Sequence, residues 1–169
     1  ETRQHSNLHS LTQRSTLANA LVYDANGSQT FDGQTLGFIY DANDQLAEAF
    51  LDNGAGGGTA GNGVKDGTEL TVATYRYDVF GRRVEKNVTA NNPNGIPAAV
   101  TRFYYSGQRI IEERDGAAAP NDAVLAVYAY GSYIDEPLTM WRDANANGQF
   151  DAGEKFYFHQ NRMFSTYAL

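Results

Sequence analysis

A short tyrosine–aspartate turn recurs along the chain, and it restricts the fold more than any other feature of the sequence. Its clearest copy lies within Tyr75–Val88, where alternating residues enter a turn that Asp78 opens and Gly81 closes. An Asp at the start of a turn accepts hydrogen bonds from the turn's backbone N–H groups, and Gly adopts positive φ without steric cost. The pattern therefore predicts two antiparallel strands joined by a tight turn.

Two further copies precede this one. The copy at Tyr23–Gly27 is intact, whereas the copy at Tyr40–Leu46 carries Asp44 in place of the Gly. A unit that recurs along a chain indicates a fold built by stacking one supersecondary element. We therefore predict an all-β protein made of successive antiparallel β-hairpins that form one twisted sheet.

Similar patterns continue to the end of the chain, which we divide into a hairpin region, 1–137, and a C-terminal segment, 138–169. Two Gly- and Asn-rich insertions, 52–68 and 90–97, are expected to be loops, the first one flexible. Asp32-Gly33 predicts one more turn, and Ser106-Gly107 predicts a two-residue hairpin connection. The main further strands are predicted at Leu70–Tyr77, Arg82–Thr89, Thr101–Tyr105, Gln108–Arg114, Val124–Tyr130, Tyr133–Trp141, Lys155–His159 and Met163–Leu169. An apolar final strand left unpaired would expose backbone donors and acceptors, so we expect it to pair.

The composition agrees with strands and excludes several classes of function. The 169 residues include 17 Gly, 11 Tyr and 9 Phe, and the net charge of −7 disfavours nucleic acid or an anionic membrane as partner. No apolar run reaches the roughly 20 residues of a membrane span. The absence of Cys excludes disulfides and thiolate chemistry. Because the chain begins at Glu1 without a visible signal peptide, we expect a processed segment of a longer protein.

Most residues capable of catalysis lack the partners that catalysis needs. His5 and His9 have no third metal ligand near them, and His159 has no nucleophile with an evident base. Asp135 and Glu136 are adjacent, so on a strand they point to opposite faces and cannot act as a pair. We assign no catalytic residue and expect the protein not to be an enzyme.

One loop carries a pattern with defined chemistry. The segment from Asp143 to Glu154 matches D-x-[DN]-x-[DN]-G-x5-E at every specified position. Ca²⁺ takes about six to eight oxygen ligands, and this spacing supplies them from a single loop. The predicted metal ligands are Asp143, Asn145, Asn147, the backbone carbonyl of Gln149, Asp151 often through water, and Glu154 with both oxygens.

The surroundings of this loop differ from those of a calcium sensor. Leu138–Trp141 and Phe156–Phe158 alternate like strands, so we predict an EF-hand-like loop that bridges a β-hairpin and rigidifies it. Gly148 permits the sharp turn, and Phe150 is expected to pack beneath the loop. The alternative is a surface turn that matches by chance, since Asp24–Gly27 begins similarly but lacks the acidic end.

Taken in order, these segments resemble the Rhs/YD-repeat family of bacterial toxin shells and teneurin cell-surface proteins. The resemblance rests on five stretches: LVYDANGSQTFDGQTLGFIYDANDQLAEA, YRYDVFGRRVEK, RFYYSGQRIIEER, YGSYIDEPLTMWRD and FYFHQNRMFSTYAL. It implies a segment near the C-terminal end of the repeat region, with hairpins wound into a spiral sheet. The family's toxins continue with an Asp-Pro self-cleavage motif and a variable toxin, and neither is found in these residues.

Three functional hypotheses follow, and the sequence leaves them open. The first is a structural wall segment of an extracellular or cell-surface protein, stabilised by Ca²⁺, with other repeat segments or copies of itself as partners through sheet edges. The second is an adhesion module whose tyrosines bind glycans, although tyrosines at this spacing also serve sheet packing. The third is part of a toxin-encapsulating shell whose toxin lies outside the segment.

Overall fold

The structure, a computed structural model, describes residues 2–6, 10–117, 122–133, 136–160 and 166–168. Strands dominate these residues, and their only helical element is the single 3-10 turn η1 (Ala55–Gly57). Nowhere in these ranges is there a helix with the length and apolarity needed to cross a bilayer. The prediction of an all-β protein is confirmed.

The strands follow one another at short intervals. Their bounds are β1 (Arg3–His5), β2 (Leu11–Arg14), β3 (Val22–Tyr23), β4 (Gln29–Phe31), β5 (Leu36–Tyr40), β6 (Leu46–Leu51), β7 (Thr71–Tyr77), β8 (Arg83–Val88), β9 (Ala99–Ser106), β10 (Arg109–Asp115), β11 (Val124–Tyr130), β12 (Pro137–Arg142), β13 (Lys155–Tyr157), β14 (His159–Gln160) and β15 (Thr166–Ala168).

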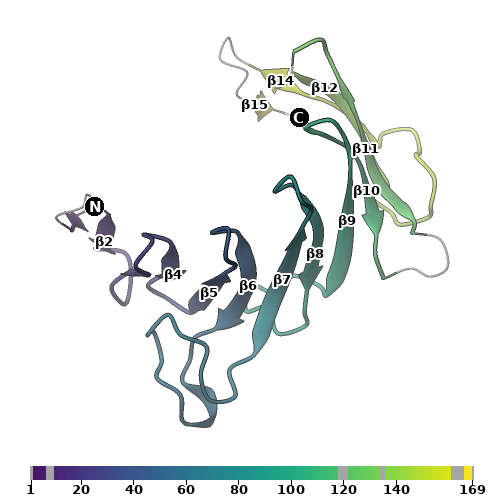
Figure 1. Cartoon of the computed structure of the whole chain (residues 1–169). Helices are drawn as coiled ribbons and strands as arrows, with labels where there is room; N and C mark the ends of the chain where they lie inside the picture. The colour runs from purple at the N-terminus through teal and green to yellow at the C-terminus, as the bar shows by residue number, and fades with distance from the viewer. Residues whose placement is uncertain (1, 7–9, 118–121, 134–135, 161–165, 169) are drawn as a thin grey trace. The chain divides into compact units, whose positions relative to one another are not determined.

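Within each sheet, every strand pairs with its neighbours in sequence. An open sheet of 11 strands runs in order from β3 to β13, and β1–β2 and β14–β15 form separate two-stranded sheets. The chain divides into two compact units. The first consists of Glu1–Arg76 and Asn87–Ala98, and the second of Tyr77–Lys86 and Ala99–Leu169. Within the first unit β4, β5 and β6 lie side by side, and within the second β9 to β12 do so (Figure 1). The prediction of successive antiparallel hairpins is therefore confirmed.

The three tyrosine–aspartate turns share one geometry. In each, a single carboxylate oxygen of Asp24, Asp41 or Asp78 accepts the backbone N–H groups two and four residues further on. The donors are Asn26 (3.0 Å) and Ser28 (2.8 Å), Asn43 (2.8 Å) and Gln45 (3.0 Å), and Phe80 (2.9 Å) and Arg82 (3.0 Å). The fourth residue has positive φ in all three turns: 89° at Gly27, 58° at Asp44 and 78° at Gly81. Asp44 thus occupies a conformation that favours Gly, as the repeat pattern indicates.

A second contact recurs where the tyrosine precedes a turn. The hydroxyl of that tyrosine donates to a backbone carbonyl near the start of the preceding strand. The four pairs are Tyr23 to Leu11 (2.7 Å), Tyr40 to Gln29 (2.9 Å), Tyr105 to Arg83 (2.8 Å) and Tyr130 to Ile110 (2.8 Å). We call this contact the tyrosine staple, because it joins one hairpin to the strand before it.

Few large side chains are fully buried. Phe31 and Phe50 are the largest among the described residues, and both belong to the first unit. Gly37 lies directly against Phe50, so that a methyl group placed there would overlap the ring. Gly61, in the 52–68 loop, faces the ring of Phe31, which a Cβ atom would approach to 3.2 Å. The loop therefore covers one of the two buried rings.

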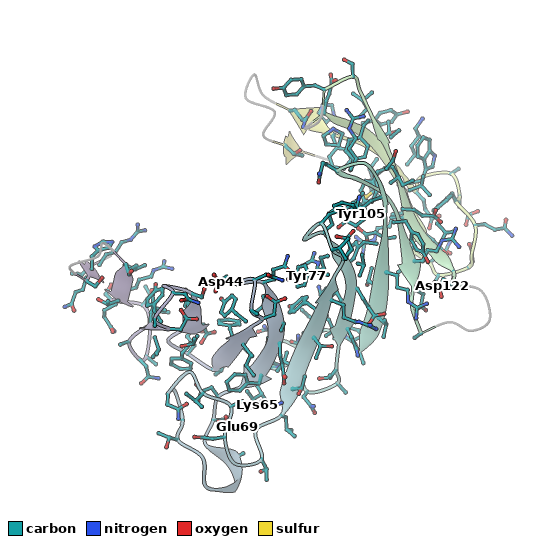
Figure 2. All side chains as sticks on the ribbon, viewed as in Figure 1. Asp44, Lys65, Glu69, Tyr77, Tyr105 and Asp122 are labelled. Carbon is teal, nitrogen blue, oxygen red and sulfur yellow. The ribbon has the colours of Figure 1, made fainter. Side chains whose placement is uncertain are left out.

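The 52–68 loop has more fixed contacts than its glycine content indicates. The buried carboxylate of Asp52 accepts the N–H groups of Gly61 (2.5 Å) and Gly63 (2.7 Å). The buried Glu69, just after the loop, accepts those of Gly54 (2.8 Å) and Asp66 (3.1 Å). Lys65, labelled in Figure 2, forms an ion pair with Glu48 of β6. Carboxylates rather than apolar side chains organise this loop.

One predicted hairpin connection differs from the structure. The two-residue connection between β9 and β10 is Gly107–Gln108 rather than Ser106–Gly107, since Ser106 pairs with Arg109. Of the expected final strand, Thr166–Ala168 form β15, which pairs with β14 as expected, and residues 163–165 and 169 lie outside the described residues. The proposed boundary between 1–137 and 138–169 stays a prediction.

Two glycine substitutions separate backbone strain from steric overlap. Gly27→Ala places a Cβ with no atom within 4 Å but at φ 89°, so we expect a loss of about 1 kcal/mol of unfolding free energy. Gly37 has no positive φ, but the methyl group of Gly37→Ala would overlap Phe50, so we expect a loss of about 1–3 kcal/mol of unfolding free energy. Urea unfolding of the two variants tests this order, and equal losses would contradict it.

The tyrosine staple is tested by removing one hydroxyl. Tyr130→Phe keeps the ring but leaves the carbonyl of Ile110 without its donor, which we expect to cost about 1 kcal/mol. Tyr157→Phe is the control, because within the described residues the contact of this exposed tyrosine is a stack with Lys155. We expect that variant to change thermal stability by less than about 0.5 kcal/mol. Indistinguishable melting curves for the two variants would rule out a stabilising role for the staple.

Candidate calcium-binding loop

The predicted calcium loop closes a β-hairpin. Strands β12 and β13 pair antiparallel, and the segment from Asp143 to Glu154 connects them. Thr139 lies opposite Tyr157, Met140 opposite Phe156, and Trp141 opposite Lys155. The expectation of a loop bridging a hairpin, with strands rather than helices on both sides, is confirmed.

The first and last residues of the loop are buried acids. Asp143 is 8% exposed and Glu154 is 7% exposed. Asp143 accepts the N–H groups of Asn147 (3.1 Å) and Gly148 (2.7 Å). Glu154 accepts those of Ala144 (2.9 Å) and Asn145 (3.3 Å) with one oxygen and that of Asp151 (2.8 Å) with the other. The two carboxylates thus fix the loop backbone by accepting five of its N–H groups.

The third carboxylate lies between two amides. Asp151 accepts the side-chain NH₂ groups of Asn145 (3.0 Å) and Asn147 (2.7 Å). These hydrogen bonds, from Asn145 first and then Asn147, lower the pKa of Asp151 below the ordinary value of an Asp. The amide oxygens of both asparagines accept N–H groups of the loop itself, from Asn147 and Gln149.

The loop backbone has positive φ at Ala146 and Gly148, and again at Gly153 near its end. Gly148 has φ 79°, as expected at the sixth position, and Ala146 at the fourth has φ 57°. Gln149 is exposed, and its backbone N–H donates to Asn147. Phe150 is 40% exposed, so the expectation that it packs beneath the loop is wrong.

The donor set fits a hard cation, although the side chains are not gathered around one point. Asp143 and Glu154 are nearly buried charges, and within the described ranges neither forms an ion pair with Lys or Arg. A buried carboxylate without an opposite charge is costly, which a bound cation would offset. In the described residues no three acidic, His or Cys side chains converge as metal ligands. The side-chain NH₂ groups of Asn145 and Asn147 face Asp151. Calcium binding would require these amides to rotate.

The other residues considered from the sequence have no site built around them. His5 and His159 are exposed on the short strands β1 and β14, and Glu136 accepts the N–H of Tyr133 (3.2 Å). His9 and Asp135 lie outside the described residues. The structure therefore gives none of these residues a catalytic arrangement within the ranges that it describes.

Sequence reasoning missed the aromatic contacts of the basic residues in the second unit. Several Arg and Lys side chains lie over rings from neighbouring positions. The pairs are Arg82 over Phe80 and Tyr105, Arg83 over Phe103, Arg109 over Tyr130, Arg114 over Tyr104, and Lys155 over Trp141 and Tyr157. The signal was available, because alternating basic and aromatic residues on adjacent strands place such groups on one face.

Comparison with known proteins finds distant relatives among nucleases. The tRNA3(Ser)-specific nuclease WapA of Bacillus spizizenii is 27% identical over 144 residues, which are 84% of this chain and 5% of that protein. The tRNA nuclease WapA of Bacillus subtilis strain 168 is 28% identical over 114 residues, 66% of this chain and 4% of that protein. No family model matches the chain. The matched region is thus about one twentieth of a much longer relative.

These comparisons correct two expectations. We expected a member of the Rhs/YD-repeat family, but no family model matches and the relatives found are WapA nucleases. A short turn motif indicates only which residues the backbone conformation of the turn requires, and unrelated proteins can share that requirement. We also expected the protein not to be an enzyme, and the names of the relatives overturn this. A search for catalytic residues within about 5% of such a protein's length could not exclude an enzyme.

Proposed function

We propose that this chain is a structural segment of a much longer secreted or cell-surface protein, in which its hairpins form part of a continuous sheet wall. The observation that carries the proposal is the strand order, in which every neighbour in the 11-stranded sheet is also a neighbour in sequence. Such a sheet grows by adding hairpins, and the match to about 5% of a relative fits one section of a longer array. For the whole protein we propose the activity named for the relatives, cleavage of tRNA.

The ends of the sheet provide the partners in this proposal. Within the described residues the 11-stranded sheet ends at β3 and β13. An end strand presents unpaired backbone groups that a further strand can complete. We propose that these partners are further hairpins of the same polypeptide or other copies of this segment.

Calcium would stabilise the wall at the loop between β12 and β13. The ligands would be the six predicted ones: Asp143, Asn145, Asn147, Gln149, Asp151 and Glu154. Support comes from the two buried carboxylates, which lack a basic partner among the described residues, and from the oxygen-only donor set. A site of this composition suits the millimolar calcium outside cells, with a Kd of roughly 10⁻⁴ to 10⁻³ M.

Calorimetric titration of the 169-residue chain with CaCl₂ tests the calcium site. We expect one binding event, weakened at least about tenfold by Glu154→Gln, because the variant loses a charged ligand. Asp24→Asn is the matched control, since Asp24 begins the similar Asp-Ala-Asn turn that has no closing Glu. Absence of heat in the parent chain, or an equal loss in the control, would contradict the site.

The structural role is tested in the whole protein. We expect purified whole protein to cleave tRNA and to keep this segment resistant to protease, because its backbone groups are paired in the sheet. Gly37→Ala should increase protease cleavage within the segment, because the added methyl group overlaps Phe50. Cleavage of tRNA by the 169-residue chain alone would place the activity in this segment and overturn the proposal.

A further inference from the structure

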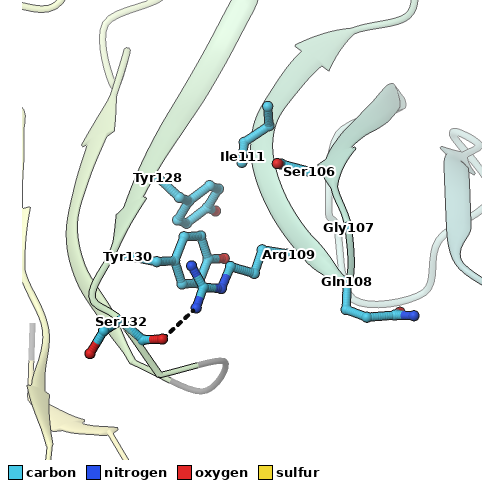
Figure 3. A pocket seen from close by; sticks show the side chains of 8 residues that line it. All are labelled: Ser106, Gly107, Gln108, Arg109, Ile111, Tyr128, Tyr130 and Ser132. Atoms are coloured by element: carbon cyan, nitrogen blue, oxygen red, sulfur yellow. Dashed lines mark hydrogen bonds between the residues drawn. The ribbon is translucent and has the colours of Figure 1, made fainter.

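A groove lies on the face of the second unit, across β10 and β11. Its volume is about 540 Å³, and its walls include Ser106, Arg109, Ile111, Tyr128, Tyr130 and Ser132. Figure 3 shows the rings of Tyr128 and Tyr130 beside the side chain of Arg109. The volume falls within the range of small-molecule sites.

The pairing of β10 with β11 brings the principal side chains together. Glu112 opposes Val127 and Glu113 opposes Ala126. Beyond these pairs, Arg109 of β10 and Tyr130 of β11 line the same groove. The guanidinium lies 5.4 Å from the centroid of the Tyr130 ring.

The two tyrosines present their rings rather than their hydroxyls. The Tyr130 hydroxyl donates to the carbonyl of Ile110 (2.8 Å), and the Tyr128 hydroxyl donates to Glu113 (2.7 Å). Burial first, and then the hydrogen bond to Glu113, raise the pKa of Tyr128 above its ordinary value, so the phenol stays neutral. The rings are therefore fixed, uncharged surfaces.

Arg109 has donors to spare. A guanidinium carries five N–H donors, and within the described residues Arg109 gives one hydrogen bond, to the carbonyl of Ser132 at 3.4 Å. Among the same residues no carboxylate forms an ion pair with it, whereas Arg82 and Arg114 each pair with one carboxylate and Arg102 pairs with two. No described carboxylate therefore competes with a ligand for the charge of Arg109.

The preceding hairpin shows what is missing at Arg109. Arg82 also follows a turn and also lies over a stapled tyrosine, Tyr105, at 4.8 Å. Its guanidinium binds the turn carboxylate of Asp78, with Nε 2.7 Å from the oxygen. The connection before Arg109 is the shorter Gly107–Gln108, and Ser106 follows Tyr105 where Asp78 follows Tyr77, so the equivalent carboxylate is absent.

We infer that the groove binds an acidic sugar, a hexuronic acid unit of a polysaccharide, whose carboxylate pairs with Arg109. Guanidinium binds carboxylate bidentately, and the C–H face of a pyranose suits the negative face of an aromatic ring. The side chains of Ser106 and Ser132 offer partners for sugar hydroxyls. A peptide that binds by adding a strand needs a sheet edge. Because β10 and β11 are interior strands, the groove favours an acidic sugar over an acidic peptide.

The test is an NMR titration of the full 169-residue chain with trigalacturonic acid. We expect amide shifts around Arg109 and Tyr130 and a Kd on the order of 1 mM. Arg109→Gln should weaken binding at least about tenfold, whereas Arg114→Gln, on the same strand but outside the groove, should not. Ser106→Asp should also abolish binding, because its carboxylate would supply an internal partner for Arg109.

Three comparison ligands give outcomes that would overturn the inference. Equal binding of the neutral galactose trisaccharide would remove the role of the carboxylate. Equal or tighter binding of triglutamate would identify a peptide site, and equal shifts with sodium sulfate would show an unspecific anion site. Loss of binding in all variants, Arg114→Gln included, would equally count against a defined groove. None of these outcomes bears on the sheet role, which concerns backbone pairing.

Discussion

The hydrogen bond from a tyrosine hydroxyl to the preceding strand is the contact on which the order of the hairpins depends. Hairpins in sequence need a reason to stay together, and a large apolar core does not supply it, because Phe31 and Phe50 are the largest fully buried side chains described. The tyrosine staple joins strands 11 to 22 residues apart in sequence. The Asp of the next turn then satisfies the turn's own N–H groups. Polar contacts of fixed geometry thus replace much of what burial contributes in a two-layer fold.

The local rules of this fold could be predicted from the sequence because they involve neighbouring residues. Asp78 and Gly81 stand at positions where turn chemistry is decided within five residues, and the structure confirms their hydrogen bond and positive φ. The hairpin of β12 and β13 was predictable for the same reason, since its strands alternate on both sides of the loop. The periodicity of the strands and the turn residues were therefore sufficient to predict the fold class.

Features set by distant residues could not be predicted in the same way. The acceptor of the Tyr40 hydroxyl is the carbonyl of Gln29, which depends on the register between two strands. The burial of Asp52 depends on where Gly61 and Gly63 return, and no pattern in the glycine-rich loop indicates that. Phe150 was placed beneath its loop by analogy of position, but it is 40% exposed, whereas Asp143 and Glu154 are buried. Function was harder still, because a hairpin repeat specifies a backbone and says little about what the backbone carries.

The same argument explains where chemistry arises on a scaffold of this kind. A stapled tyrosine uses its hydroxyl for the sheet, which leaves its ring face available to a neighbouring cation. At Tyr105 that cation is Arg82, and Asp78 of the regular turn neutralises it. At Tyr130 the turn is shortened, the Asp is absent, and Arg109 has no acidic partner among the described residues. A small departure from the repeat thus converts a structural contact into a charged, aromatic surface, and it does so without disturbing the staple that holds the strands.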